Sequence, residues 1–250
     1  MLISVAMCTY NGEKYLQEQL DSIANQSRLP DELIVCDDNS SDQSVSILER
    51  FSGSASFPVK IFKNQTNIGS TKNFEKAIRL CAGDIIVLSD QDDTWNHDKL
   101  KLMEEAFSAS AQVGAVFSDG DVVDENLSFL GYTLWDKFYF GKKLRREFLN
   151  GNAFQILLNH SVVTGATVAF RSNLRNKILP ISSLWFHDCW IAFLISIISD
   201  IKFIDKKLVK YRQHKGQQLG GRKMTVTEQI TMANSLTDYN VQIQQYDKII

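Results

Sequence analysis

Apolar and polar residues alternate in blocks along the first half of the chain, in an order typical of repeated strand and helix units. Short apolar runs predict strands over residues 2–8, 33–36, 59–62 and 84–89. The amphipathic segments that follow them predict helices over 13–26, 43–51 and 71–81, and a fourth from about 96. Such alternation predicts an α/β fold with a mainly parallel central sheet flanked by helices.

The pattern weakens in the second half of the chain. After a strand at 113–118 we expect short strands, an aromatic and basic stretch over 134–146, and an apolar segment over 162–170. Residues 225–250 are polar and helix-like and end without a capping signal, which is typical of a truncated chain.

Composition narrows the function classes. A chain of 250 residues, 44% hydrophobic and 22% charged, can bury the core of one large domain. Its net charge of −2 argues against a nucleic-acid binder that relies on bulk positive charge. The four cysteines form no CxxC pair and the amino terminus lacks signal-peptide features, so a reduced cytoplasm is expected. The longest apolar run, 190–198, is too short to span a bilayer.

The acidic turn Asp90–Asp93 places three carboxylates directly after the apolar strand 84–89. Crowded carboxylates repel one another unless a cation or hydrogen-bond donors compensate them. Open α/β sheets bind ligands at the carboxyl ends of strands, and Mg²⁺ is usually held by one or two carboxylates plus phosphate oxygens. The turn therefore predicts a divalent-metal site that carries phosphates. The alternative is a solvated acidic turn that caps the helix beginning near Asn96.

Two further polar turns follow predicted strands. In the segment 37–42, helix capping explains Ser40, Ser41 and Asp42 but not the doubled acid Asp37-Asp38, which could accept the N–H of a pyrimidine ring. The turn 8–12 could offer an aromatic face to a base, or could be an ordinary Asn-Gly turn. No glycine-rich nucleotide fingerprint is present, so a metal on the acidic turn is expected to hold the pyrophosphate.

An ordered set of motifs over roughly residues 1–215 resembles the inverting family 2 glycosyltransferases of the GT-A fold. The matching segments are Thr9-Tyr10-Asn11-Gly12, Asp37-Asp38-Asn39-Ser40, Asn67-Ile68-Gly69, Asp90-Gln91-Asp92-Asp93 with Trp95, the run 163–168, and His187-Asp188-Cys189-Trp190. The resemblance implies a nucleotide-sugar-binding half over 1–118, an acceptor-binding half over 119–215 and a C-terminal helical extension over 216–250.

The same resemblance implies roles for individual residues. Asp188 is expected to be the catalytic base that deprotonates the acceptor hydroxyl. Asp92 and Asp90, with His214 as a candidate third ligand, are expected to hold Mg²⁺ or Mn²⁺ on the donor diphosphate. The expected nucleotide contacts are Thr9, Tyr10, Asn11, Asp38, Asn67, Gly69, Asp90 and Gln91. The expected acceptor and sugar pocket consists of Asp93, Trp95, Thr164, Gly165, His187 and Trp190.

Several of these residues have a plainer interpretation. Asp188 could cap the helix that carries the apolar run 190–198, and His214 could be a surface or packing residue. His187 replaces an acidic residue that often precedes the base. Arg212 and Lys215 could steady phosphate charge or lie on a solvated face.

The motifs around 187–190 and 211–214 resemble the rhamnosyltransferase-like branch, which builds bacterial surface polysaccharides. The resemblance implies a dTDP-L-rhamnose donor, with UDP-sugars as the alternative, and a saccharide or lipid-linked acceptor. The aromatic and basic stretch 134–146 could rest on the inner face of the cell membrane or pack as an acceptor-side loop. No nucleic-acid partner is expected.

Two other classes of protein compete with this interpretation. The turn at 90–94 resembles the nucleophile motif of haloacid-dehalogenase-type phosphatases, and residues 120–124 resemble their later acidic motif. That fold expects the nucleophile after its first strand, whereas three predicted strands precede the strand that ends at this turn. The chain could also be an inactive nucleotide-sugar-binding module. The sequence leaves donor sugar, acceptor and oligomeric state open.

Overall fold

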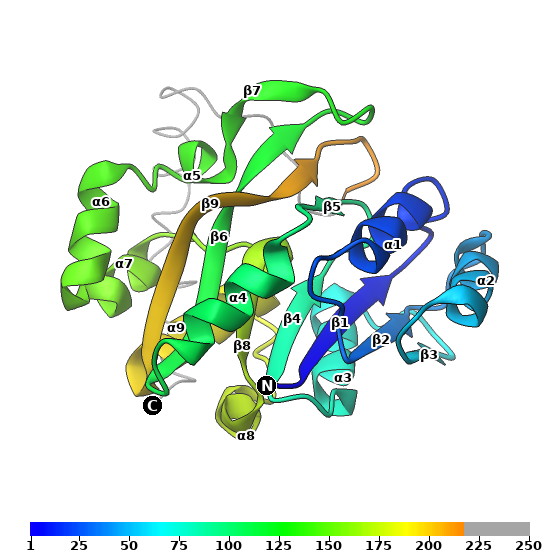
Figure 1. Cartoon of the computed structure of the whole chain (residues 1–250), viewed down its shortest axis with the longest axis horizontal. Helices are drawn as coiled ribbons and strands as arrows, with labels where there is room; N and C mark the ends of the chain where they lie inside the picture. The colour runs from blue at the N-terminus through cyan, green and yellow to red at the C-terminus, as the bar shows by residue number, and fades with distance from the viewer. Residues whose placement is uncertain (218–250) are drawn as a thin grey trace.

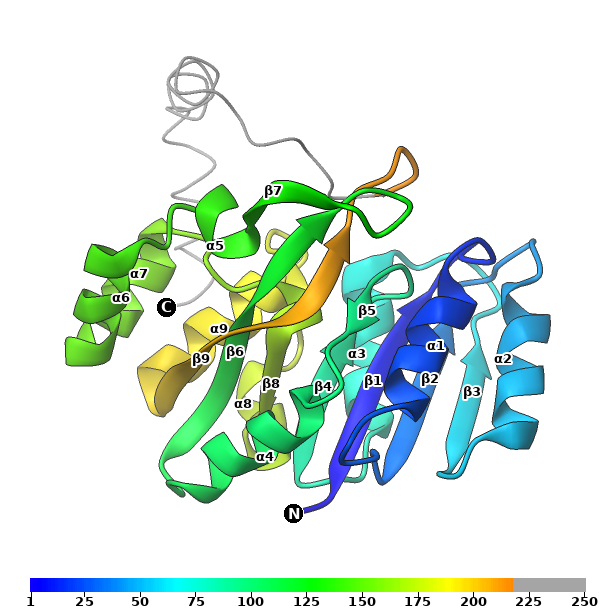
Figure 2. The ribbon, with the colours of Figure 1, turned by 45° about the horizontal axis from the view of Figure 1, so that its top comes forward.

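The structure, a computed structural model, describes residues 1–217 and forms one mixed sheet with helices on both faces (Figures 1 and 2). Within these residues the sheet has nine strands in the order β3-β2-β1-β4-β8-β6-β9-β5, with β7 paired to β6. The strands are β1 (Ile3–Thr9), β2 (Glu32–Asp37), β3 (Val59–Lys63), β4 (Ile85–Ser89), β5 (Thr94–Trp95), β6 (Val113–Val123), β7 (Phe129–Thr133), β8 (Val168–Arg171) and β9 (Asp200–Arg212).

Helices follow the strands of the first half as the sequence pattern predicts. The α-helices are α1 (Leu16–Ala24), α2 (Ser44–Ser54), α3 (Ser70–Leu80), α4 (Lys99–Ser108), α5 (Leu134–Lys137), α6 (Lys142–Glu147), α7 (Ala153–Asn159), α8 (Arg175–Ile178) and α9 (His187–Ile198). Three shorter helical turns are η1 (Phe148–Asn152), η2 (Gly165–Thr167) and η3 (Ser172–Leu174). The expected extension over 216–250 lies outside the described residues except for its first two positions.

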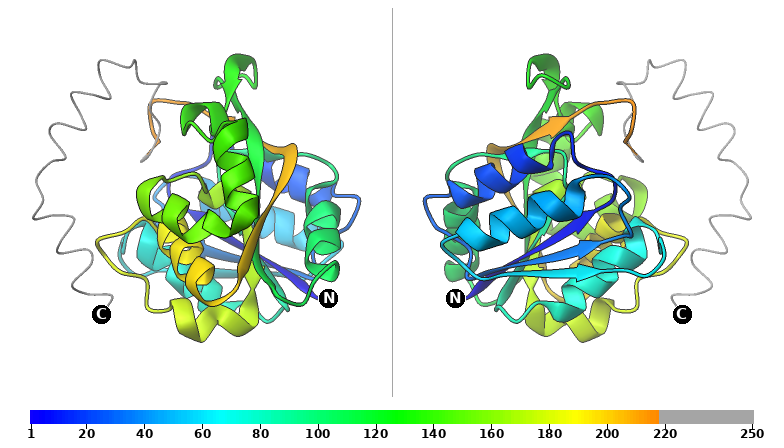
Figure 3. Two further views of the ribbon diagram at one scale, coloured as in Figure 1. Left: turned by 90° about the vertical axis from the view of Figure 1, so that its left-hand side faces the viewer. Right: turned by 90° about the vertical axis from the view of Figure 1, so that its right-hand side faces the viewer.

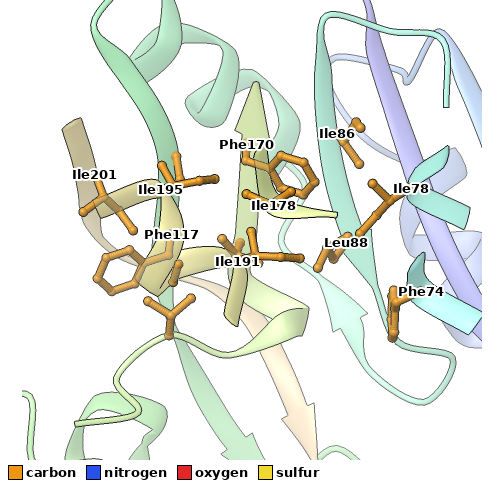
Figure 4. Packing of buried hydrophobic residues seen from close by; sticks show 14 of the residues in the cluster. Phe74, Ile78, Ile86, Leu88, Phe117, Phe170, Ile178, Ile191, Ile195 and Ile201 are labelled. Atoms are coloured by element: carbon orange, nitrogen blue, oxygen red, sulfur yellow. The ribbon is translucent and has the colours of Figure 1, made fainter. Parts of the chain in front are cut away.

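The sheet separates two apolar layers, which explains why its central strands are mostly apolar. On β4, Ile86 and Leu88 pack with α3, α8 and α9, and Figure 4 shows Ile78 of α3 and Ile191 of α9 in this layer. The alternate residues of β4 pack on the opposite face with α1, α2 and α4. Because successive side chains of a strand point to opposite faces, a strand covered on both sides does not alternate between apolar and polar residues. Figure 3 shows the helices on the two sides of the sheet.

The sheet is parallel in its first half and mixed in its second. Strands β3, β2, β1 and β4 pair in parallel, as expected. Strand β8 is antiparallel to both β4 and β6, whereas β6 and β9 pair in parallel. The strand expected at 113–118 is the first part of β6, which continues to Val123. The expectation of short strands after it is wrong for β9, which has 13 residues. Strand β9 escapes prediction because about half of its residues are polar or charged.

The parallel strands bring their carboxyl ends to one edge of the sheet. Thr9 at the end of β1 lies opposite Asp37 at the end of β2, and Met7 lies opposite Ser89 at the end of β4. The three polar turns that follow these strands therefore meet at one place, as the sequence predicts.

Part of the aromatic and basic stretch 134–146 belongs to the core. Trp135 and Phe140 are buried and pack edge-on against each other, and both contact Phe203. Their burial favours the packed-loop interpretation over a membrane-facing aromatic surface. Within the described residues, no helix is long and apolar enough to cross a membrane. The four cysteines are free thiols.

Candidate functional site

A cavity of about 590 Å³ opens where the carboxyl ends of β1, β2 and β4 meet the turn before β8 and the start of α9. Its size is that of a small-molecule site. Ten of the expected site residues line it: Thr9, Tyr10, Asp38, Asp90, Gln91, Asp92, Thr164, Gly165, His187 and Asp188. The lining thus combines residues from both expected halves of the chain.

Asp90 is a carboxylate of the lining whose surroundings oppose its charge. Burial raises its pKa to about 7, and the negative charges of Asp92 and Asp188 act in the same direction. Asp90, Asp92 and Asp188 all line this cavity, so the base candidate and the acidic turn share one site. A cation in the cavity would favour the ionised form of Asp90.

Asp92 and Asp93 have different environments although they are neighbours. Asp92 lines the cavity, and its Oδ2 lies 2.8 Å from Nε2 of His214. Asp93 is fully buried, lies outside the cavity lining, and accepts a hydrogen bond from the backbone N–H of Arg212 at 2.9 Å. The capping alternative does not apply, because α4 begins only at Lys99 and has no side-chain cap.

The expected three-ligand metal set is not assembled. Within residues 1–217, no group of three or more histidine, cysteine, aspartate or glutamate side chains could hold a metal ion. His214 contacts Asp92 itself and stacks near Tyr15, with 4.7 Å between the ring centroids. The carboxylates Asp90 and Asp92 still suit a hard divalent cation that completes its shell with phosphate oxygens.

Arg212 is a buried structural residue and does not line the cavity. Its guanidinium is 1% exposed and donates to the backbone oxygens of Asp92 at 2.7 Å and Glu125 at 2.6 Å. It also pairs with Glu18 of α1 at 2.6 Å. The structure therefore does not support Arg212 as a phosphate contact, because its guanidinium N–H groups already bind these protein oxygens. Lys215 is exposed outside the lining.

Lys99 is a buried cation behind the acidic turn. Its Nζ donates to the backbone oxygen of Ala166 at 2.6 Å and lies 3.7 Å from the ring centroid of Trp95. Burial lowers its pKa to about 7, although the charges of Asp93 and Asp90 oppose this change. Lys99 thus places a positive charge near Asp90 and Asp93, and it hydrogen-bonds the η2 turn.

Asp37 and Asp38 have different roles, because Asp37 is buried in the protein and Asp38 lines the cavity. Asp37 is buried and accepts hydrogen bonds from Thr9 and Ser40. Asp38 lines the cavity and accepts from the N–H groups of Ile68 at 2.8 Å and Gly69 at 2.9 Å. The loop at 67–69 therefore supports Asp38, although Asn67 and Gly69 do not line the cavity.

Gln91 fixes the first turn to the acidic turn. Its amide oxygen accepts from the N–H of Tyr10 at 2.8 Å, and its amide nitrogen donates to the Tyr10 oxygen at 3.0 Å. A Cβ at Gly12 would collide with the Gln91 side chain, so glycine permits this approach. Asn11 lies outside the cavity with φ +47°, and its side chain accepts from the N–H of Ser41. The segment therefore forms an Asn-Gly turn and also places Tyr10 at the cavity.

Asp188 belongs to the first turn of α9 and does not cap it. The N-cap is Phe186, which makes no side-chain cap, and Asp188 Oδ2 accepts from the N–H of Gly165 at 2.8 Å. His187 is stacked on Phe74, with 4.0 Å between ring centroids, and burial lowers its pKa. A neutral His187 beside Asp188 leaves that carboxylate as the acid–base group at this end of the cavity.

Two expected pocket tryptophans lie outside the lining. Trp95 is 6% exposed and packs in the apolar layer under Lys99. Trp190 donates from its ring nitrogen to the oxygen of Ile178 at 2.7 Å. Both residues stabilise elements that carry cavity residues. The later acidic motif of the phosphatase alternative is also outside the lining: Asp121 pairs with Lys207, and Asp124 closes its own turn.

The sequence interpretation missed several cavity residues. The most informative are Lys137 and Phe138 at the end of α5 and Tyr211 in β9, which have no motif of their own. The burial of Lys99 could have been predicted, because Lys99 lies four positions before the buried residue Met103 and so shares its face of the helix.

Comparison with known proteins adds a family to this geometry. A family model described as glycosyl transferase family 2 matches residues 4–175. An uncharacterized glycosyltransferase from Nostoc sp. is 27% identical over 224 residues, which cover 86% of this chain and 65% of the relative. The dTDP-rhamnosyl transferase RfbG from Shigella flexneri is 28% identical over 227 residues, which cover 86% of this chain and 73% of RfbG.

Solved structures confirm the fold class. S. aureus TarS in complex with UDP-GlcNAc superposes with a TM-score of 0.67 at 22% identity, over 87% of this chain and 60% of TarS 1-349. The mannosyltransferase PcManGT from Pyrobaculum calidifontis, in complex with GDP-Man and Mn²⁺, gives 0.62 at 19% identity, over 86% and 57% of the two chains. The chain thus spans less than two thirds of each of these structures, and the likeness shows a GT-A-like fold.

Proposed function

The chain belongs to glycosyl transferase family 2, and on this premise we propose that it transfers a sugar from a nucleoside-diphosphate donor to an acceptor hydroxyl with inversion at the anomeric carbon. The observation that carries the proposal is that Asp90 and Asp92 at the end of β4 share one cavity with Asp188 of α9. A single in-line displacement needs a site for the leaving diphosphate and a base for the incoming hydroxyl, and this cavity offers both.

The nucleotide would bind at the ends of β1 and β2. Tyr10 is 43% exposed at the cavity and could stack on the base. Asp38 Oδ2 accepts one hydrogen bond, from Gly69, and a carboxylate oxygen can accept a second one from the N–H of a pyrimidine ring. Thr9 and Gln91 complete the lining on this side.

Asp92 and Asp90 would hold Mg²⁺ or Mn²⁺ between the acidic turn and the diphosphate. Burial and the negative charges of Asp92 and Asp188 together raise the pKa of Asp90, which supports this fit. When bound, such an ion neutralises charge that develops on the leaving phosphate. His214 hydrogen-bonds Asp92 and would orient its carboxylate toward the metal ion. Direct ligation of the ion by Nε2 of His214 would require this hydrogen bond to break.

Asp188 would accept the proton of the acceptor hydroxyl. Its Oδ2 is oriented by a hydrogen bond from the N–H of Gly165. Position 165 requires glycine, because a Cβ there would lie 2.8 Å from His187 Nε2. Thr164 and Gly165 would bound the space between the sugar and the acceptor. A positioned general base contributes typically about 10²–10⁴-fold to the rate.

The preferred donor is dTDP-L-rhamnose. The similarity to RfbG, named as a dTDP-rhamnosyl transferase, supports this choice, and a UDP-sugar is the alternative because TarS was solved with UDP-GlcNAc. The proposed acceptor is a saccharide or a lipid-linked saccharide in bacterial surface polysaccharide synthesis. The proposed location is the cytoplasm, with peripheral contact to the cell membrane for a lipid-linked acceptor.

The test is donor turnover by wild type and Asp188→Asn, with dTDP-L-rhamnose and UDP-GlcNAc, and with water or a candidate saccharide as acceptor. We expect Asp188→Asn to lower nucleotide release by about 10²–10⁴-fold while dTDP affinity changes less than about threefold. The control is Asp200→Asn, which changes an exposed carboxylate at the start of β9. Nucleotide binding without turnover by wild type would instead support a non-catalytic module.

A further inference from the structure

The charges that line the cavity are unevenly distributed. Four carboxylates line it, and within the described residues Lys137 is the single lysine or arginine of the lining. Lys137 is the last residue of α5, on the side of the cavity formed by β9. Its Nζ lies 5.6 Å from the ring centroids of both Phe138 and Tyr211, which also line the cavity.

Lys137 has no anionic partner within residues 1–217, since none of the ion pairs there includes it. Its pKa is lowered by burial, with no carboxylate acting against the change. By contrast, Lys14 and Lys207 each pair with a carboxylate that raises their pKa. A partly desolvated ammonium without a counter-charge is unfavourable unless a ligand supplies the anion.

The backbone around Lys137 is well fixed. Thr133 and Asp136 form a reciprocal capping box at the start of α5, and the N–H of Trp135 donates to Asp119 Oδ1 at 3.0 Å. The ring of Trp135 is buried against Phe140. These contacts hold the end of α5 against the core, so the ammonium is presented from a fixed turn and not from a loose loop.

We propose that Lys137 forms an anion subsite of the cavity, whose ammonium binds a phosphate oxygen of the bound ligand. This inference rests on the proposed function, which brings a phosphorylated ligand into the cavity. The phosphate belongs either to the donor diphosphate or to a phosphate-bearing acceptor. In both cases Lys137 offsets part of the repulsion between the ligand's phosphates and the carboxylates of the lining.

The test is calorimetric binding of three probes in the presence of Mn²⁺: UDP, inorganic pyrophosphate and glycerol 3-phosphate. Wild type is compared with Lys137→Gln, with Lys137→Arg, which keeps the charge, and with Lys143→Gln, which changes an exposed lysine of α6. We expect Lys137→Gln to weaken at least one probe about tenfold, and Lys137→Arg and Lys143→Gln to stay within about threefold of wild type.

The pattern of losses separates the two sources of phosphate. Weaker UDP and pyrophosphate binding assigns the subsite to the donor diphosphate, whereas a selective loss of glycerol 3-phosphate assigns it to the acceptor. Equal affinities of wild type and Lys137→Gln for every probe that wild type binds would overturn the subsite. Failure of wild type to bind UDP at all would reject the proposed function together with this inference.

Discussion

Asp90 lowers the stability of the folded protein at neutral pH, a cost that fits its proposed role in binding a cation. Burial and the charges of Asp92 and Asp188 raise its pKa to about 7 from the ordinary value of 3.8. The folded protein therefore binds a proton on Asp90 more tightly than the unfolded chain does. Between about pH 4 and 7 this group makes the free energy of unfolding fall as pH rises, and above pH 7 the full cost remains.

Replacement of Asp90 by asparagine should remove this cost. In EDTA at pH 8 we expect Asp90→Asn to be more stable than wild type by up to about 3 kcal/mol, and the difference should disappear toward pH 4. Denaturant unfolding of both proteins from pH 4 to 8 measures this. The exposed-site control Asp200→Asn should show no such pH-dependent gain, and an Asp90→Asn variant that is less stable than wild type at pH 8 would contradict the electrostatic account.

At this scale the sequence predicts which residue types gather at the site better than it predicts their directions. Asp38, Asp92 and Asp188 line the cavity because polar side chains at the carboxyl ends of parallel strands and at a nearby helix start converge there. Asp93 turns inward because its carboxylate accepts a hydrogen bond from the backbone N–H of Arg212, which lies far away in the sequence. A local pattern contains no information about such a partner.

Elements of the two halves are joined behind the cavity by Lys99 of α4. Its hydrogen bond to the oxygen of Ala166 holds η2, and the N–H of Gly165 in the same turn holds Asp188 of α9. A cation on α4 thereby links the acidic turn to the turn that orients the candidate base.

Loss of this cation should be costly. At pH 6, where Lys99 is charged, we expect Lys99→Met to lower the free energy of unfolding by about 1–3 kcal/mol, because it leaves the backbone oxygen of Ala166 without its hydrogen-bond donor. Lys101→Met, on an exposed position of the same helix, should change it by less than about 0.5 kcal/mol. Chemical unfolding of the two variants tests the difference, and equal stabilities would argue against the bridge.

The regular elements could be predicted where one physical signal dominates. Strands β1, β2 and β4 are buried on both faces, so their apolar runs predict them to within a residue or two. Helix α1 begins at Leu16, later than expected, because residues 12–15 form a turn in which the Gly12 oxygen accepts from two N–H groups. Strand β9 could not be predicted as one element, because its stability comes from pairing with β6 and not from its own pattern.

At the scale of the whole molecule, the parallel first half and the mixed second half both contribute residues to the lining of one cavity. The first half provides Tyr10, Asp38 and the acidic turn, and the second provides Lys137 and Asp188. Sequence pattern could predict the class of the fold and the meeting of three strand ends. The antiparallel insertion of β8 between β4 and β6, which brings the η2 turn to the cavity, depends on long-range pairing and could not be predicted.

The central claim is that this cavity binds a nucleoside diphosphate through a divalent cation held at the acidic turn. The most direct test is calorimetric titration of dTDP and UDP into wild type and Asp92→Asn, each with Mn²⁺ and with EDTA. We predict that wild type binds with Mn²⁺ and loses at least about tenfold in affinity in EDTA, and that Asp92→Asn binds weakly in both conditions. Binding by wild type that is equal with Mn²⁺ and with EDTA and unchanged in Asp92→Asn, or no binding of either nucleotide, would contradict the account.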